Sequence, residues 1–245
     1  MVLTYHNIAG YKNANTVSLN VFEDQLLLLL KKGYQIVSID GYIKNLKSNH
    51  KQKQVAITFD DGFINIKTKV LPVIKKHNAH ITIFLPVNLI GTEYAWKDEK
   101  IQILSWNDIR VMNECPLVSF GSHTCNHFSL GHLTEAERKK ELCESKTILE
   151  KELQCSVNYF AYPFGQREHL GKKSDPFLAE CGYSAAFTTN WSRQNSIRNI
   201  FFLNRIDMAT FDDTESFERF LNNRIDLKHC KQRIKNIQFR IGLRT

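Results

Sequence analysis

Short apolar runs alternate with longer amphipathic stretches along most of the chain. Residues 55–59 form one such run, which ends abruptly at Asp60, as a buried strand does. Elsewhere, hydrophobic residues such as Phe22, Leu26 and Leu29 recur at helical spacing. The pattern predicts strands at residues 2–5, 35–39, 55–59, 81–85, 117–120, 159–162, 184–188 and 201–206, and helices at residues 18–32, 64–77, 105–115, 135–153, 176–181 and 211–227.

Several helix ends carry their own signals. Ser105 with Asp108, and Thr134 with Glu137, have the spacing of capping boxes and predict helices that begin directly after Ser105 and Thr134. Pro72 lies inside the predicted helix 64–77 and is expected to cap or kink it.

Regular alternation of strands and helices predicts a parallel sheet covered by helices. Seven or eight such units fit a (β/α) barrel, and a doubly wound open sheet is the alternative. No repeat or low-complexity linker interrupts the chain. We therefore predict a single α/β domain over residues 1–228, followed by a basic tail at residues 229–245.

The net charge is +8 and the isoelectric point about 9.1, a balance that favours anionic partners. The lysines are scattered, however, and often stand beside glutamates, as in residues 135–141. This distribution is typical of a solvated basic surface, so we expect no nucleic-acid partner.

The six cysteines show no CxxC and no paired spacing. They predict neither a disulfide framework nor a zinc ribbon, and scattered thiols suit a reducing compartment. The first residues do not resemble a signal peptide, and no apolar run is long enough to span a bilayer. These features together predict a cytoplasmic location.

Ionisable residues collect where the predicted strands end. His123 and His127 are four positions apart, so both can reach one metal ion, although this spacing alone is a weak signal. Asp60 or Asp61 would supply a third ligand, and the other aspartate could act as a base toward a water molecule. The alternative is structural, with one aspartate capping the following helix. Cys125, between the histidines, is expected to be a bystander.

Three segments resemble motifs of the NodB-homology polysaccharide deacetylases, carbohydrate esterase family 4. They are Thr58–Gly62 (TFDDG), Ser122–His127 (SHTCNH) and Ala161–Gly165 (AYPFG). The resemblance implies a distorted (β/α) barrel that removes acetyl groups from sugars with the help of a metal ion. It further implies that Asp60 is the base, while Asp61, His123 and His127 bind Zn²⁺ or another divalent ion such as Co²⁺ or Ni²⁺. The backbone N–H of Tyr162 would help to hold the oxyanion.

The chain departs from the family at its last motif, which normally supplies a histidine as general acid. Residues 203–207 contain none, whereas His6 follows the first predicted strand. This arrangement resembles the circularly permuted poly-N-acetylglucosamine deacetylase branch and assigns the acid role to His6; a core histidine is the alternative. Arg205 would pair with Asp60 and keep it ionised, or bridge residues at the surface. Phe164 and Trp191 would form walls of the site or serve the core.

The expected partner is an N-acetylated glycan or a glycan precursor, and the oligomeric state cannot be inferred. A catalytically inactive glycan-binding module on the same fold is the alternative function. The basic tail could favour peripheral association with an anionic membrane surface.

Overall fold

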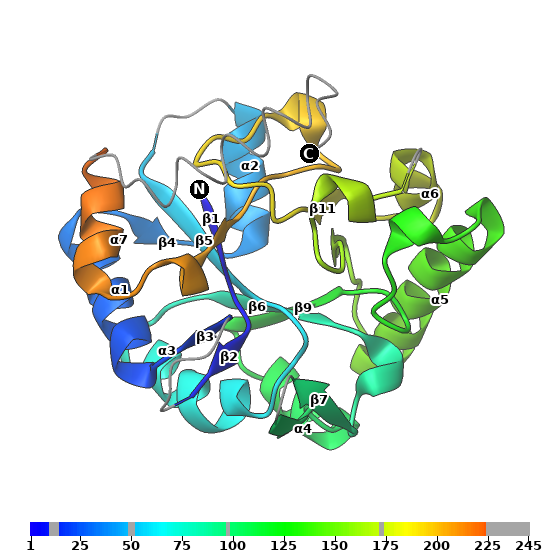
Figure 1. Ribbon diagram of the computed structural model, residues 1–245, viewed down its shortest axis with the longest axis horizontal. Helices are drawn as coiled ribbons and strands as arrows, with labels where there is room; N and C mark the ends of the chain where they lie inside the picture. Colours follow the sequence, from blue (N-terminus) through cyan, green and yellow to red (C-terminus); the bar gives the residue numbers. More distant parts are fainter. Residues whose placement is uncertain (10–14, 49–51, 97–98, 172–173, 224–245) are drawn as a thin grey trace.

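A parallel β-sheet curls around the centre of the computed structural model (Figure 1). The structure describes residues 1–9, 15–48, 52–96, 99–171 and 174–223. Within these residues the sheet has the strand order β11-β10-β9-β6-β5-β1-β12, with β4 paired to β5. The strands, in chain order, are β1 (Val2–Tyr5), β4 (Gln35–Ile36), β5 (Gln54–Phe59), β6 (Ile81–Leu85), β9 (Val118–Ser122), β10 (Tyr159–Ala161), β11 (Ala185–Phe187) and β12 (Ile206–Asp207).

The two edges of this sheet are joined by one segment near the C-terminal end of the described chain. Leu203 forms a parallel bridge with Phe187 of β11, and three residues later Ile206 pairs with Leu3 of β1. The predicted distorted barrel is therefore confirmed, and the alternative of an open doubly wound sheet is wrong. The proposed boundary between domain and tail, at residues 228–229, lies outside the described residues.

Helices pack around the outside of the sheet (Figure 1). The predicted capping boxes of Ser105 and Thr134 are both formed, each with its side chain accepting from the N3 backbone N–H. Pro72 lies at the start of α3, directly after a π-helical turn at Ile66–Val70, so the predicted disruption at Pro72 is confirmed. The helices are α1 (Leu19–Lys31), α2 (Ile39–Ser48), α3 (Leu71–Lys76), α4 (Trp106–Asn113), α5 (Glu135–Leu153), α6 (Ser174–Glu180) and α7 (Thr214–Leu221).

Two small sheets were not predicted. The strands β7 (Glu93–Trp96) and β8 (Glu99–Gln102) form an antiparallel pair, and β2 (Asn7–Ile8) pairs in parallel with β3 (Thr16–Val17). The strand predicted at residues 201–206 is also shorter than expected. Only β12 and the Leu203 bridge are formed there.

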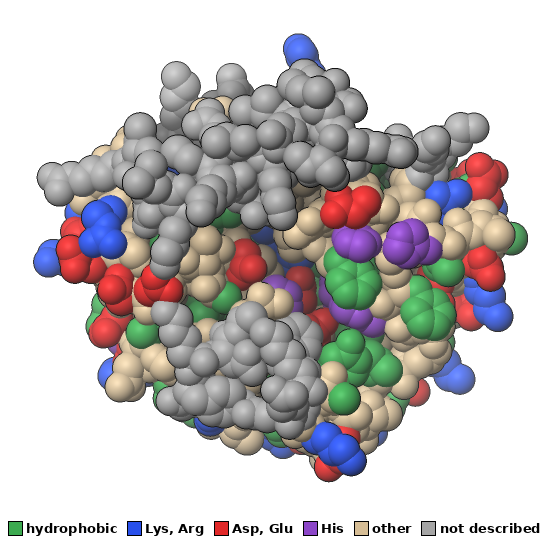
Figure 2. Space-filling view, in the orientation of Figure 1, with side chains coloured by type: hydrophobic (Ala, Val, Ile, Leu, Met, Phe, Trp, Pro, Cys, Tyr) green, Lys and Arg blue, Asp and Glu red, His purple; other side chains and the backbone are tan. Residues whose placement is uncertain are grey.

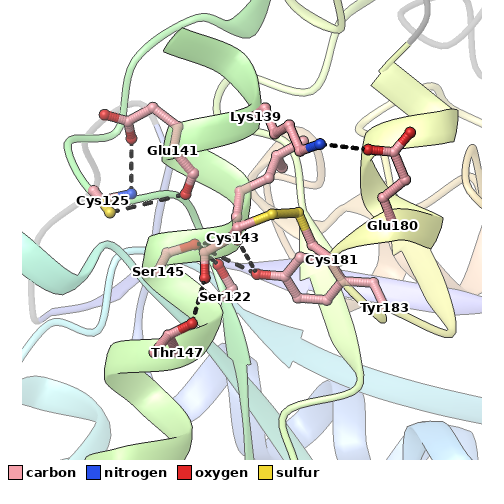
Figure 3. Close-up of a disulfide and its surroundings, with 11 residues drawn as sticks. Ser122, Cys125, Lys139, Glu141, Cys143, Ser145, Thr147, Glu180, Cys181 and Tyr183 are labelled. Carbon is pink, nitrogen blue, oxygen red and sulfur yellow. Dashed lines mark hydrogen bonds and ion pairs between the residues drawn. A yellow bond between two sulfur atoms is a disulfide. The ribbon is translucent and has the colours of Figure 1, made fainter. Parts of the chain in front are cut away.

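A disulfide joins Cys143 of α5 to Cys181, directly after α6 (Figure 3). The expectation of scattered thiols without a disulfide framework did not include this bond. The sequence could not indicate it, because the two partners are 38 positions apart and have no local spacing signal. Disulfides persist in oxidising environments, so the cysteines no longer support a reducing compartment. Within the described residues, no helix combines the length and apolar character needed to cross a bilayer.

Alternation along the strands decides what faces the barrel interior. On β5, Ala56 packs with Val2, Phe84 and Phe187 in one buried cluster, and side chains two positions apart share a face. Thr58 lies on the same face, and Asp60 follows directly beyond the end of the strand. Along this face the side chains are apolar at Ala56 and polar at Thr58 and Asp60, toward the carboxyl end of the strand.

Candidate active site

A sharp turn after β5 separates the two adjacent aspartates. The Asp60 N–H donates to Tyr5 O and continues the sheet, whereas Asp61 and Gly62 have φ angles of 70° and 71°. A Cβ on Gly62 would lie 2.5 Å from Leu85 Cδ2, so this turn requires glycine. The turn sends the two carboxylates toward different partners.

Asp61 faces both motif histidines. Its Oδ1 lies 3.3 Å from His127 Nε2 and 3.7 Å from His123 Nε2. The Nδ1–H of His123 donates to Ala161 O at 2.7 Å, which fixes the tautomer and leaves Nε2 facing Asp61. Of the two aspartates, Asp61 is therefore the one that faces both histidines, as the family resemblance implied.

These three side chains fit a divalent metal ion. One ligand atom from each of Asp61, His123 and His127 lies within 4.8 Å of the others. Asp61 Oδ2 is buried and has no hydrogen-bond partner among the described residues. Two imidazole nitrogens and a carboxylate are also the donor set of catalytic zinc sites.

Protonation of Asp61 and His123 agrees with this fit, whereas burial, which would lower the pKa of His127, is outweighed by the hydrogen bond and charge of Asp61, which raise it. Burial alone would raise the pKa of Asp61, but the hydrogen bond and charge of His127 hold the pKa of that carboxyl below its usual range. Burial lowers the pKa of His123 to about 4. Asp61 is therefore ionised and His123 neutral near pH 7, as metal ligands must be.

Asp60 pairs with Arg205 inside the barrel, as predicted. Two bonds of 2.7 Å join Nη1 to Oδ1 and Nη2 to Oδ2, and both side chains are almost completely buried. Arg205 is held in turn by Thr188 O and Thr58 Oγ1. Burial would raise the pKa of Asp60, but the Arg205 guanidinium and the nearby histidines hold it below its usual range.

His6 follows the end of β1 and lies beside Asp60. Its Nε2 lies 3.9 Å from Asp60 Oδ2, and 14% of its side chain is exposed. The pairing of Tyr5 with Phe59 puts His6 level with Asp60 at the rim. The first strand therefore brings a titratable group to the site, which the sequence predicted from its position at a strand end.

The predicted role of Tyr162 needs correction. Its N–H donates to Phe187 O at 3.0 Å and continues the β10–β11 ladder, so this group is not directed at a substrate. Phe164, two positions later, has a φ angle of 61°, and its ring lies 4.9 Å from the His127 ring. No hydrogen bond from the Phe164 N–H is found in the described part of the chain. The Tyr162 N–H is therefore already engaged within the sheet, whereas the Phe164 N–H is not.

An aromatic margin lies beside Asp61, His123 and His127. Phe164 and Phe128 are each about half exposed, and the Phe164 ring also contacts the His169 ring at 4.9 Å. Trp191, by contrast, packs against Phe220. Figure 2 shows acidic and histidine side chains in a hollow on this face, with hydrophobic side chains along one margin.

Backbone strain concentrates in the same place. Of the eight non-glycine residues with positive φ in the described chain, four line the site: Asp61, Thr124, His127 and Phe164. Such conformations cost about 1–3 kcal/mol each and cluster at functional sites. Their distribution independently points to this rim as the functional centre.

Comparison with known proteins agrees with the site. The profile of the polysaccharide deacetylase family matches residues 47–186, which include Asp60, Asp61, His123, His127 and the Tyr162–Phe164 segment. The chain therefore belongs to the polysaccharide deacetylase family.

Individual relatives extend the comparison over most of the chain. A Bacillus subtilis protein named as a polysaccharide deacetylase, YxkH, is 25% identical over 224 residues, covering 91% of this chain and 76% of its own length. The Escherichia coli poly-β-1,6-N-acetyl-D-glucosamine N-deacetylase is 22% identical, and the match covers 86% of this chain but only 38% of that protein.

Solved structures show the same fold. The Streptococcus pyogenes deacetylase PplD, in complex with acetate, has a TM-score of 0.77 and 26% identity, with 89% of this chain and 96% of that chain covered. IcaB from Ammonifex degensii has a TM-score of 0.75 and 25% identity, with 84% and 90% covered.

Proposed function

We propose that this chain is a metal-dependent deacetylase that removes acetyl groups from an N-acetylated glycan. The observation that carries the proposal is the meeting of Asp61, His123 and His127 beside a separate, ionised carboxylate, Asp60. Zn²⁺ suits this donor set, and Co²⁺ or Ni²⁺ would be bound by similar ligands. A cation held there would polarise the acetyl carbonyl and lower the pKa of the attacking water.

The remaining chemistry belongs to the protein side chains. Asp60 accepts a proton from the attacking water, and the bidentate contact with Arg205 keeps Asp60 ionised and fixes its orientation. His6, on the same rim, donates a proton to the leaving amine. The Phe164 N–H takes the role first assigned to Tyr162 and donates to the developing oxyanion.

The aromatic margin supports a sugar as the substrate. Exposed aromatic rings beside a catalytic centre offer flat apolar surfaces, and Phe164 and Phe128 are each about half exposed, with the Phe164 ring next to that of His127. The Escherichia coli relative is named for poly-β-1,6-N-acetyl-D-glucosamine. An N-acetylglucosamine-containing glycan is therefore the first substrate to test.

The test measures acetate release from N-acetylglucosamine oligomers and polymer, with and without a chelator. Release should stop with the chelator and return on adding Zn²⁺. Asp60→Asn should abolish turnover while Zn²⁺ binding persists. An Asp60→Asn variant with full activity would refute the assigned role, and glycan binding without any acetate release would favour the inactive binding module.

A further inference from the structure

Glu141 is a charged residue in an unusual place. It lies on α5, a helix rich in solvated charges, yet only 7% of the residue is exposed. Its carboxylate faces the loop that carries the motif histidines, and Figure 3 shows it beside Cys125. No ion pair involving Glu141 is present among the residues that the structure describes. A buried carboxylate of this kind needs another reason to be there.

Hydrogen bonds to the loop at residues 123–127, called the histidine loop below, explain why the Glu141 carboxylate is buried. Glu141 Oε2 accepts from the backbone N–H groups of Cys125 at 2.8 Å and Asn126 at 3.0 Å. Glu141 Oε1 accepts from Asn126 Nδ2 at 2.5 Å. One carboxylate therefore satisfies three donors located between His123 and His127, and hydrogen bonds to an ionised acceptor are the stronger kind.

The loop needs such a restraint because of its backbone. Thr124 and His127 have φ angles of 69° and 57°, which residues with a Cβ rarely adopt unless the surroundings enforce them. The opposite side of the loop is held by the backbone N–H groups of Val87 and Asn88, which donate to Thr124 O and Cys125 O. The loop is thus fixed through its carbonyls on one side and through its amides, by Glu141, on the other.

We propose that Glu141 is a positioning residue of the metal centre. It holds the Cys125–Asn126 backbone so that His127 Nε2 meets Asp61 and His123 at the distances needed for a shared ion. The Ala161 carbonyl orients His123 in the same indirect way. The part of this inference that concerns the ion rests on the proposed function, whereas the part that concerns the loop does not.

The first measurement is Zn²⁺ affinity, by competition with a chromophoric chelator. Glu141→Ala should weaken binding about 10–100-fold, the usual effect of removing a group that supports a metal ligand. Glu141→Gln keeps one acceptor oxygen and should lose less. Glu144→Ala is the matched control, because Glu144 lies on the same helix and is exposed. Affinity of Glu141→Ala within twofold of the wild type would overturn the proposal.

The second measurement needs no metal. Amide hydrogen exchange of Cys125 and Asn126, followed by NMR on the metal-free protein, should be at least about tenfold faster in Glu141→Ala, since both N–H groups lose their acceptor. Unchanged exchange would overturn the proposal. If Glu141→Ala does not fold, Glu141→Gln is measured instead; because it keeps one acceptor oxygen, smaller changes are expected, and Zn²⁺ affinity and exchange rates equal to those of the wild type would overturn the proposal. A wild type that binds no divalent ion would refute the metal-dependent function, and the exchange result would still decide the role of Glu141.

Discussion

Replacing Arg205 with methionine should destabilise the protein strongly, because it leaves a buried carboxylate without its counter-charge. The pair is joined by two 2.7 Å bonds, and 0% of the Arg205 side chain and 2% of the Asp60 side chain are exposed. Removing one partner of a buried ion pair costs about 3–5 kcal/mol. For a chain of this size that corresponds to a fall in Tm of about 6–20 °C.

A surface pair provides the control. Arg110 and Glu152 are also 2.8 Å apart, but their side chains are 50% and 33% exposed. Exposed pairs contribute about 0–1 kcal/mol, so Arg110→Met should change the free energy of unfolding by less than about 1 kcal/mol. Both variants are compared by urea denaturation at pH 7, with thermal unfolding as the second probe.

The cost of Arg205→Met should also depend on pH. Because the pKa of folded Asp60 is held low, its ion pair stabilises the wild type above the unfolded pKa of about 3.9 and is lost as pH falls through the folded pKa. The difference between wild type and variant should therefore shrink as the pH is lowered.

A double variant tests whether the charge is the cause. Adding Asp60→Asn to Arg205→Met removes the uncompensated carboxylate and should recover at least about 1 kcal/mol of the lost stability. The reasoning is refuted if Arg205→Met costs no more than Arg110→Met, or if the double variant is no more stable than Arg205→Met alone.

Two further predictions concern the acid and the disulfide. His6→Gln should lower kcat about 10²–10⁴-fold with Zn²⁺ affinity unchanged, because His6 is assigned to proton transfer and not to the metal; a parallel loss of Zn²⁺ binding would contradict that division of roles. Replacing Cys143 and Cys181 by serine should reduce the free energy of unfolding by about 4 kcal/mol, from loop entropy over 38 residues, as measured by urea denaturation. Replacing the free Cys155 is the control, and equal stability of all three proteins would show that the crosslink contributes nothing.

Local chemistry explains which features the sequence predicted. The helix at Glu135–Leu153 was predicted at both ends, because its capping box fixes the start and its apolar stripe the length. The meeting of Asp61, His123 and His127 could be predicted because strand ends in a parallel barrel share one rim, so that residues far apart in the chain come together there.

Features that depend on packing between elements could not be read from the sequence. Whether the Tyr162 N–H is available depends on the register between β10 and β11, which no residue of the motif encodes. Cys143 and Cys181 meet only because α5 and α6 pack together. Glu141 resembles the solvated glutamates around it on α5, and only the position of the histidine loop distinguishes it.

The bond between Asp60 and Arg205 also has a consequence for synthesis of the protein. The two residues are 145 positions apart, so at about 5–20 residues per second the ribosome adds Arg205 about 7–30 s after Asp60. During that interval β12 does not yet exist, and the edge of β1 that will pair with it is open. Burial of Asp60 before then would leave its charge unpaired, which favours an open and solvated barrel until the last strand emerges. The residue proposed as the catalytic base thereby disfavours closure of the barrel before Arg205 has been added.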